Sequence, residues 1–435
     1  MTVCDCSVCQ RTRIEHPDYL TTLPPELLRY ISSLVHAVSP KQYLGGVARV
    51  FLPIARELFF RRVEVRSFSR LALLCGIMRK DEVVGEFVES MAIDLDEETA
   101  DPGFPKNKKV HGLFRRLFAL TYLSVTNAPR LALAVLSPPY HGECLSALET
   151  LSLEDKFSSL DNPFDPRHYE YLDMYPSLEQ FDLEVTRSLS SIRKARAKVS
   201  ACELYASPAC LQLSGFLRNN RAVPALLESF LGVCALYLWD KTVARTDNLS
   251  PLLRSVPDPE QLTFLSLGSA CDDDEDISDA LSTFTNLYHI EFQAGSWTSA
   301  VLEVLPLLEH LRRICFYRWA DVSCSDLAAI LSGDVHIKEL KKIILQKVVF
   351  AGSGDVVCGG LQEKKRLSIG WTDKFTLDGL VPLLDLAETR RIELTGLAVE
   401  VAKERRIEME AEKEKRRAAK ERLVALEEKM AALRS

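Results

Sequence analysis

The sequence of 435 residues contains no run of about 18 uncharged apolar residues, the length that a membrane-spanning helix needs. It has no surplus of basic residues either, because 54 Lys and Arg stand against 61 Asp and Glu. Nucleic-acid binding as a main activity needs such a surplus. The N-terminus shows no secretory signal. We therefore expect a cytoplasmic or nuclear protein that binds neither membrane nor nucleic acid.

The common catalytic motifs are also missing. The sequence has no P-loop, no Gly-x-Ser-x-Gly, no His-Glu-x-x-His and no glycine-rich dinucleotide motif. Its eight histidines are dispersed, and none pairs with a nearby Cys or Ser as in a catalytic triad. A triad can still be assembled from distant positions. We expect a chain that is not an enzyme and carries no cofactor.

Two clusters of potential metal ligands lack the spacing of a metal site. The first is Cys4, Cys6 and Cys9, to which His16 could add a fourth ligand. Zinc sites usually take two separated pairs of ligands, and a second pair is absent. The second is the acidic run 272–276, which lacks the glycine and spaced ligands of a calcium loop. We predict a disordered tail over residues 1–19 and a solvated acidic loop.

The 12 cysteines show no framework of spacings. Several lie inside apolar runs, as Cys75, Cys234 and Cys315 do. This favours buried free thiols in a reducing compartment over disulfide bonds.

What the sequence does contain is a repeat. Apolar residues make up 47% of it, and many follow the pattern apolar-x-x-apolar-x-apolar, as in Leu148-x-x-Leu151-x-Leu153. The middle residues of the copies are Val63, Ile93, Leu123, Leu151, Phe181, Leu211, Leu236, Leu265, Ile290, Ile314, Ile343, Leu367 and Ile392. They recur every 24 to 30 residues. The pattern predicts a series of short strands.

Helix-like segments lie between these strands, with apolar residues three and four apart. The clearest are 278–284, 299–308, 325–331 and 376–386. One strand and one helix per unit is typical of a leucine-rich repeat, whose stacked units form a parallel sheet. A doubly wound α/β domain is the alternative, but it would normally carry a glycine-rich loop after its first strand. We therefore predict an α/β fold with a leucine-rich-repeat solenoid over residues 63–396.

Residues 20–62 predict a separate module of three short helices. The first has apolar residues on one face at Leu27, Ile31, Leu34 and Val38. A second starts near Ser39-Pro40, and a third follows Pro53. A unit of this size buries little apolar surface by itself. A partner or the leucine-rich-repeat solenoid, which we also call the ladder, must therefore cover its apolar surface.

The segments LPPELLRYISSLV and VARVFLPIARELFFRRVEV resemble the F-box of fungal F-box proteins with leucine-rich repeats. The resemblance implies that the module binds a Skp-family adaptor of a cullin-RING ubiquitin ligase. The positions that match the motif are Leu23, Pro24, Glu26, Leu27 and Ile31. An ordinary amphipathic helix that caps the solenoid is the alternative.

Strand residues that alternate with the buried ones face the concave side of such a ladder. They include Tyr237 and Trp239, then Glu291 and Gln293, then Cys315 and Tyr317. An aromatic patch of Tyr237, Trp239 and Tyr317 suits a protein partner.

Residues 397–435 predict one long charged helix. Ala419, Leu423, Leu426, Met430 and Leu433 give about two heptads, which permits but does not establish a coiled coil. Taken together, the sequence predicts the substrate-recognition subunit of an SCF-type ubiquitin ligase with an unknown protein target. The alternative is a leucine-rich-repeat scaffold with no role in ubiquitin transfer.

Overall fold

The computed structural model describes most of the repeat region and both helical ends. The described residues are 23–38, 51–95, 113–128, 131–132, 135–136, 145–155, 169, 172–185, 208–214, 222–239, 249–268, 276–292, 299–317, 322–346 and 375–432. The chain divides into two compact units, Met1–Leu148 and Glu149–Ser435, called unit 1 and unit 2. The Cys4, Cys6, Cys9 and His16 cluster, residue 293 and the predicted second helix up to residue 50 lie outside the described residues.

Unit 1 combines helices with the first strands. Its elements are α2 (Pro25–Val38), α3 (Leu52–Arg61), β1 (Arg62–Val65), α4 (Phe68–Lys80), α5 (Val83–Phe87), β2 (Ser90–Asp94), η4 (Phe114–Arg116) and β3 (Tyr122–Thr126). Strands β1, β2 and β3 pair in this order and are parallel. The third predicted helix ends at Arg61, and β1 starts at the next residue, so no loop separates the helices from the first strand.

Unit 2 continues the same alternation. Its strands are β4 (Thr150–Asp155), β5 (Gln180–Val185), β6 (Cys210–Ser214), β7 (Ala235–Trp239), β8 (Phe264–Gly268), β9 (His289–Phe292), β10 (Arg313–Tyr317), β11 (Lys342–Gln346) and β12 (Glu393–Thr395). From β5 on, each strand pairs in parallel with the one before it. This order, with helices interleaved, is consistent with a repeat solenoid.

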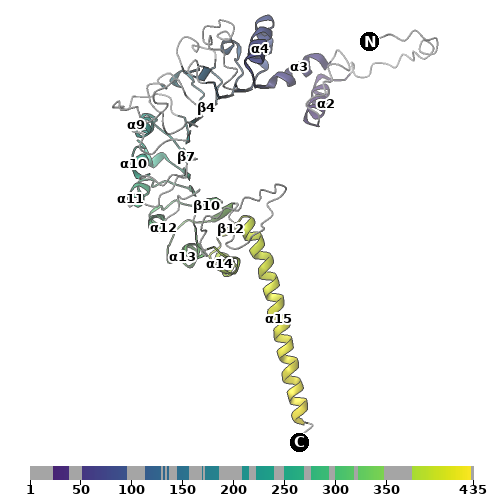
Figure 1. Ribbon diagram of the computed structural model, residues 1–435, viewed down its shortest axis with the longest axis vertical. Helices are drawn as coiled ribbons and strands as arrows, with labels where there is room; N and C mark the ends of the chain where they lie inside the picture. Colours follow the sequence, from purple (N-terminus) through teal and green to yellow (C-terminus); the bar gives the residue numbers. More distant parts are fainter. Residues whose placement is uncertain are drawn as a thin grey trace, which may run out of the picture. The chain divides into compact units, whose positions relative to one another are not determined.

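Helices line one side of the strands in unit 2 (Figure 1). They are α9 (Ala222–Ser229), α10 (Ser250–Leu253), α11 (Ile277–Ser282), α12 (Ser299–Val304), α13 (Cys324–Ser332) and α14 (Leu377–Arg390). Single turns η7 (Leu172–Met174), η8 (Pro259–Gln261) and η9 (Leu305–Leu307) add to them. The four helices expected over 278–284, 299–308, 325–331 and 376–386 are therefore confirmed, with ends shifted by a few residues.

Side-chain caps fix the starts of two of these helices. Ser323 and Asp326 form a reciprocal capping box at the start of α13. The Thr376 hydroxyl accepts a hydrogen bond from the Gly379 amide at the start of α14. Such caps satisfy backbone amides that have no partner within the helix.

The predicted repeat positions lie in register along the sheet of unit 2. Eight of them occupy one row of paired residues: Leu151, Phe181, Leu211, Leu236, Leu265, Ile290, Ile314 and Ile343. All eight are buried. The spacing in the sequence therefore marks one continuous apolar row that the strands form together.

Two positions of the predicted series are wrong, and a third lies outside the described residues. In unit 1 the row of Val63 and Leu123 passes through Met91, two residues before Ile93. At the end of unit 2, Leu394 rather than Ile392 pairs with Ile343. Strand β12 pairs directly with β11. The predicted position Leu367 lies outside the described residues.

Whether a cysteine is buried depends on the element that carries it. Cys75 on α4 and Cys315 on β10 are buried, as expected, and neither is in a disulfide. Cys234 is exposed, in contrast to the expectation, because it lies in the turn before β7 and not within the strand. An apolar neighbourhood in sequence does not place a turn residue in the core.

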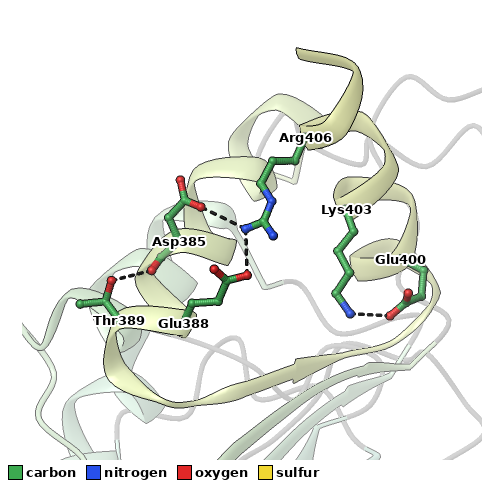
Figure 2. A network of polar contacts seen from close by, with 6 residues as sticks. All are labelled: Asp385, Glu388, Thr389, Glu400, Lys403 and Arg406. Atoms are coloured by element: carbon green, nitrogen blue, oxygen red, sulfur yellow. Dashed lines mark hydrogen bonds and ion pairs between the residues drawn. The ribbon is translucent and has the colours of Figure 1, made fainter. Parts of the chain in front are cut away.

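The helix α15 (Leu397–Ala432) covers the end of unit 2 with its first turns and then leaves it. Ala398, Val399 and Ala402 are buried against α14, β11 and β12. Figure 2 shows Arg406 of α15 reaching Asp385 and Glu388 of α14, at 3.0 and 2.9 Å. From residue 410 onward every helical position with a described side chain is exposed. The predicted long helix is confirmed.

Neither a membrane segment nor a metal site occurs within the described ranges. No helix there combines the length and the apolar character needed to cross a bilayer. Nor does that part of the chain bring three or more His, Cys, Asp or Glu side chains into a group that suits a metal ion.

Candidate functional site

Helix α2 carries an apolar surface that is largely exposed. We call Leu27, Tyr30, Ile31, Leu34 and Val38 the α2 stripe. Leu27 and Leu34 are each 48% exposed, Tyr30 62% and Val38 85%. At 100° per residue these positions share one side of the helix. So large an exposed apolar strip on one helix is typical of a surface that binds a protein.

Of the five residues that match the F-box motif, Leu23 and Pro24 come just before this helix, and Glu26, Leu27 and Ile31 lie on it. Leu23 and Ile31 are half-buried, whereas Pro24, Glu26 and Leu27 are exposed. The Pro24 carbonyl accepts a hydrogen bond from the Leu27 amide at 3.0 Å, which fixes the first turn. Glu26 lies in that turn, where the helix dipole favours a carboxylate. None of the five is fully buried.

The other side of α2 holds it to unit 1. Leu28 and Ser32 are buried, and α2 packs on α3, which packs on α5 and β1. The Arg61 Nε donates a hydrogen bond to Glu89 at 2.6 Å, so the end of α3 is tied to the residue before β2. The α2 stripe is thus carried by helices anchored to the first strands of unit 1.

Unit 2 has its own candidate surface on the side of the strands away from the helices, which we call the open face. Its side chains form three rows. The first row is Thr150, Gln180, Cys210, Ala235, Phe264, His289, Arg313, Lys342 and Glu393. The second is Ser152, Asp182, Gln212, Tyr237, Ser266, Glu291, Cys315, Ile344 and Thr395. The third holds Glu154, Glu184, Ser214, Trp239, Gly268, Tyr317 and Gln346.

Aromatic rings gather at the centre of the open face. Tyr237 meets Trp239 edge to face with ring centroids 5.8 Å apart, and Phe264 at 4.7 Å. Phe264 meets the His289 ring edge to face at 4.8 Å. Aromatic pairs at these separations stabilise one another beyond simple burial. The cluster therefore gives the open face a firm apolar centre.

Trp239 is held in a single orientation. Its indole Nε1 donates a hydrogen bond to the Ser266 hydroxyl at 3.1 Å. The ring also lies against Gly268, where a Cβ atom would come within 3.0 Å of the indole. The absence of a side chain at Gly268 thus makes room for the indole.

Glu291 links this cluster to β10. It is 8% exposed, and it accepts hydrogen bonds from the hydroxyls of Ser266 and Tyr317. Burial raises the pKa of Glu291 above its usual range, and the two hydroxyls partly oppose this rise. Trp239, Ser266, Glu291 and Tyr317 therefore form one connected polar network across four strands.

His289 is close to Glu291 but does not form an ion pair with it at neutral pH. Its Nε2 lies 3.6 Å from a Glu291 carboxyl oxygen. Burial, with a smaller effect of Arg313, lowers the pKa of His289 to about 4. The imidazole is neutral at pH 7, and its Nε2 has no hydrogen-bond partner among the described residues.

The thiols and phenols of the open face are poor nucleophiles. Burial raises the pKa of Cys210 to about 11 and that of Cys315 to about 12. Burial likewise raises the pKa of Tyr237 and Tyr317 to about 12. All four groups are protonated at pH 7, which suits hydrogen bonding and contact rather than nucleophilic attack.

Sequence reasoning found part of this surface. It placed Tyr237, Trp239 and Tyr317 on the open face, where the structure brings Tyr237 and Trp239 together and joins Tyr317 to Trp239 through Glu291 and Ser266. It missed the Ser266 hydroxyl, the gap at Gly268 and the carboxylate of Asp182. Alternation within Leu265-Ser266-Leu267 and Phe181-Asp182-Leu183 was the signal for two of them.

No model of a known protein family matches this chain, and no curated protein matches its sequence significantly.

Proposed function

We propose that this protein is the substrate-recognition subunit of an SCF-type ubiquitin ligase. In this proposal residues 20–62 form an F-box-like module that binds a Skp-family adaptor. Residues 63–396 form a leucine-rich-repeat ladder whose open face binds a protein target. The chain itself performs no bond chemistry.

The observation that carries the proposal is the exposed α2 stripe. A helix that only capped the ladder would turn its apolar side inward, yet Leu27, Leu34 and Val38 are all exposed. Three of the residues that match the F-box motif, Glu26, Leu27 and Ile31, lie on this same helix. An adaptor groove that binds the α2 stripe would remove this apolar surface from water, which is energetically favourable.

The proposed mechanism is proximity. A ligase subunit raises the effective concentration of its target near the ubiquitin-loaded enzyme, because one chain carries both the adaptor-binding module and the target-binding part. Within unit 1, α3 passes into β1 without a linker, and the Arg61–Glu89 contact braces this junction.

Co-expression with a Skp-family adaptor tests the proposal. The wild-type protein is expected to co-purify with the adaptor in equal amounts. Leu27→Asp with Leu34→Asp should abolish co-purification, because two charges would enter the apolar contact. Ser33→Asp adds a charge on another exposed side of α2 and serves as the matched control. An intact wild-type protein that purifies without adaptor would favour a scaffold with no role in ubiquitin transfer.

A further inference from the structure

The helix α15 continues well past the part of unit 2 that it covers. Its first turns are buried against α14, β11 and β12, whereas every described side chain from residue 410 onward is exposed. Four of these exposed side chains form an apolar line, which we call the α15 stripe: Ala419, Leu423, Leu426 and Met430. Leu423 is 58% exposed, Leu426 60% and Met430 52%.

The α15 stripe belongs to a repeat of seven residues. Residues 414–434 read EKRRAAK, ERLVALE and EKMAALR. Each of these three segments begins with Glu followed by Lys or Arg, and each has Ala at its fifth place. The stripe occupies the third and sixth places. Apolar residues at two fixed places of a seven-residue repeat are the pattern by which one helix winds around another. The repeat therefore indicates a helical partner.

The width of the α15 stripe favours a helix over a lipid surface. At 100° per residue its four members lie within about 60° of one another, which is as narrow as the seam of a coiled coil. A helix that lies on a membrane usually buries a broader face that contains Trp or Phe. Residues 397–435 contain no aromatic residue.

Basic side chains border the α15 stripe on both sides. The second place of each segment gives one border, formed by Lys415, Arg422 and Lys429, and the seventh place gives the other, formed by Lys420 and Glu427. All five side chains are exposed. In a two-stranded coiled coil these borders face the partner helix, and their charges select the partner. Four of the five border charges are positive, which favours a partner with acidic borders.

Two of these basic residues have no carboxylate within reach on their own helix. Side chains three or four places apart are neighbours on a helix surface. Every residue three or four places from Arg422 or Lys429 is Ala or Leu. Arg417, by contrast, pairs with Glu421 at 3.2 Å. The charges of Arg422 and Lys429 are therefore available to a partner.

A second copy of this chain would fit the borders poorly. In a parallel pair, Lys415 of one copy would face Lys420 of the other and repel it, while Arg422 would face Glu427. In an antiparallel pair centred on the stripe, Lys420 would face Glu427. Arg422 would then face Lys429 and repel it. Each orientation brings at least one repulsive contact for each attractive one, whereas a helix with acidic borders attracts at four of the five positions.

We propose that the α15 stripe is a second protein-binding site, whose partner is an acidic amphipathic helix of another protein. The partner helix carries apolar residues three and four apart, with Asp or Glu on both sides of them. The two helices pair over about three heptads, or about 30 Å. The inference is independent of the proposed function, because neither the α2 stripe nor the open face takes part.

Fluorescence anisotropy on the full-length protein tests the inference. The probe is a fluorescein-labelled peptide of three heptads with Leu at both core places, Glu at both border places and Ala or Gln elsewhere. Its borders of like charge keep it from pairing with itself. The counterpart carries Lys at the border places. We expect the Glu peptide to bind at least tenfold more tightly than the Lys peptide, and more weakly as the salt concentration rises.

Two double variants locate the binding. Leu423→Ser with Leu426→Ser should weaken binding of the Glu peptide at least tenfold, because both side chains lie at the centre of the stripe. Val424→Ser is the matched control, since Val424 is 43% exposed but points away from the stripe, so binding should stay within twofold. Arg422→Glu with Lys429→Glu should lower the preference for the Glu peptide at least fivefold. Circular dichroism and thermal unfolding confirm that each variant is folded.

Equal binding of the two peptides by the wild-type protein, or no loss in the Leu423→Ser, Leu426→Ser variant, would overturn the inference. Sedimentation equilibrium tests for a second copy, and a dimer that this double variant dissociates would assign the stripe to self-association instead. Flotation with vesicles of phosphatidylcholine and phosphatidylserine in equal amounts tests for a membrane. Vesicle binding that the same variant abolishes would assign the stripe to a lipid surface instead. We expect a monomer that does not float.

Discussion

The indole of Trp239 lies against Gly268, at the point where any other residue would place a Cβ atom within 3.0 Å of the ring. The two residues are register partners on β7 and β8. The same indole donates its hydrogen bond to Ser266, two residues before Gly268 on β8. One glycine therefore decides where the largest ring of the open face stands.

Gly268→Ala is expected to displace the Trp239 indole and to lower the free energy of unfolding by about 1 kcal/mol, and Gly268→Val by about 2 kcal/mol. Urea unfolding gives the stability. Tryptophan fluorescence reports the environment of the Trp239 ring, and subtracting the spectrum of Trp239→Phe isolates its signal from the other three tryptophans. Gly76→Ala is the matched control, because no atom lies within 4 Å of its added Cβ and alanine favours the helix. An unchanged Trp239 signal in Gly268→Val would contradict the packing described.

His289 should make the protein less stable as the pH falls. Its pKa is lowered to about 4 in the folded state by burial and, less strongly, by Arg313, so the unfolded chain takes up the proton first. Stability is therefore complete above about pH 6.5 and declines as the pH falls toward 4. Because the imidazole is partly exposed to solvent, we expect a loss of about 1–2 kcal/mol.

His289→Gln removes this dependence, because glutamine does not titrate. Urea unfolding at pH 7 and pH 5 should show a smaller loss of stability in the variant than in the wild-type protein. Glu291 acts with the opposite sign, because its raised pKa makes the folded state the better proton acceptor. Since Glu291 is present in both proteins, it largely cancels in the comparison. Equal losses in the two proteins would show that His289 is not buried as described.

The C-terminal end of unit 2 depends on Gly396 more than on the polar contacts of α15. Gly396 has a φ of +124°, and an added Cβ would overlap the carbonyl oxygen of Leu345 on β11. Gly396→Ala should therefore lower the free energy of unfolding by about 3 kcal/mol. Arg406→Ala removes contacts of an arginine to two exposed carboxylates, and should cost less than about 1 kcal/mol. A larger loss of stability in Arg406→Ala than in Gly396→Ala, measured by urea unfolding, would contradict this account of the C-terminal end of unit 2.

Much of the ladder is predictable because its inward positions obey one rule. Each strand places an apolar residue in the same row. The spacing of Leu151, Phe181 and Leu211 in the sequence therefore predicts which residues of neighbouring strands pair. The prediction was wrong at β2, where the full pattern is Val88-x-x-Met91-x-Ile93. All three of these residues are buried, so the middle position of this copy is Met91 and not Ile93.

The open face is less predictable because its contacts cross strands. Alternation places Tyr237 and Trp239 outward, but only the register of β7 with β8 brings Trp239 to Ser266 and Gly268. Burial of Glu291 likewise depends on neighbours that are distant in sequence. The helix α4, by contrast, is predictable from the sequence. Ser67 caps its start, and its buried residues are three or four apart, as in an amphipathic helix.

Direct titration of the purified full-length protein with a purified Skp-family adaptor tests the central claim most sharply. We expect an equimolar complex with a Kd of about 1 μM or tighter by isothermal titration calorimetry. Leu34→Asp should weaken it at least tenfold, because a charge would enter the buried contact of the α2 stripe, and Ser33→Asp should leave it within twofold. A folded wild-type protein that gives no binding heat, at adaptor concentrations well above this Kd and at two temperatures, would contradict the account.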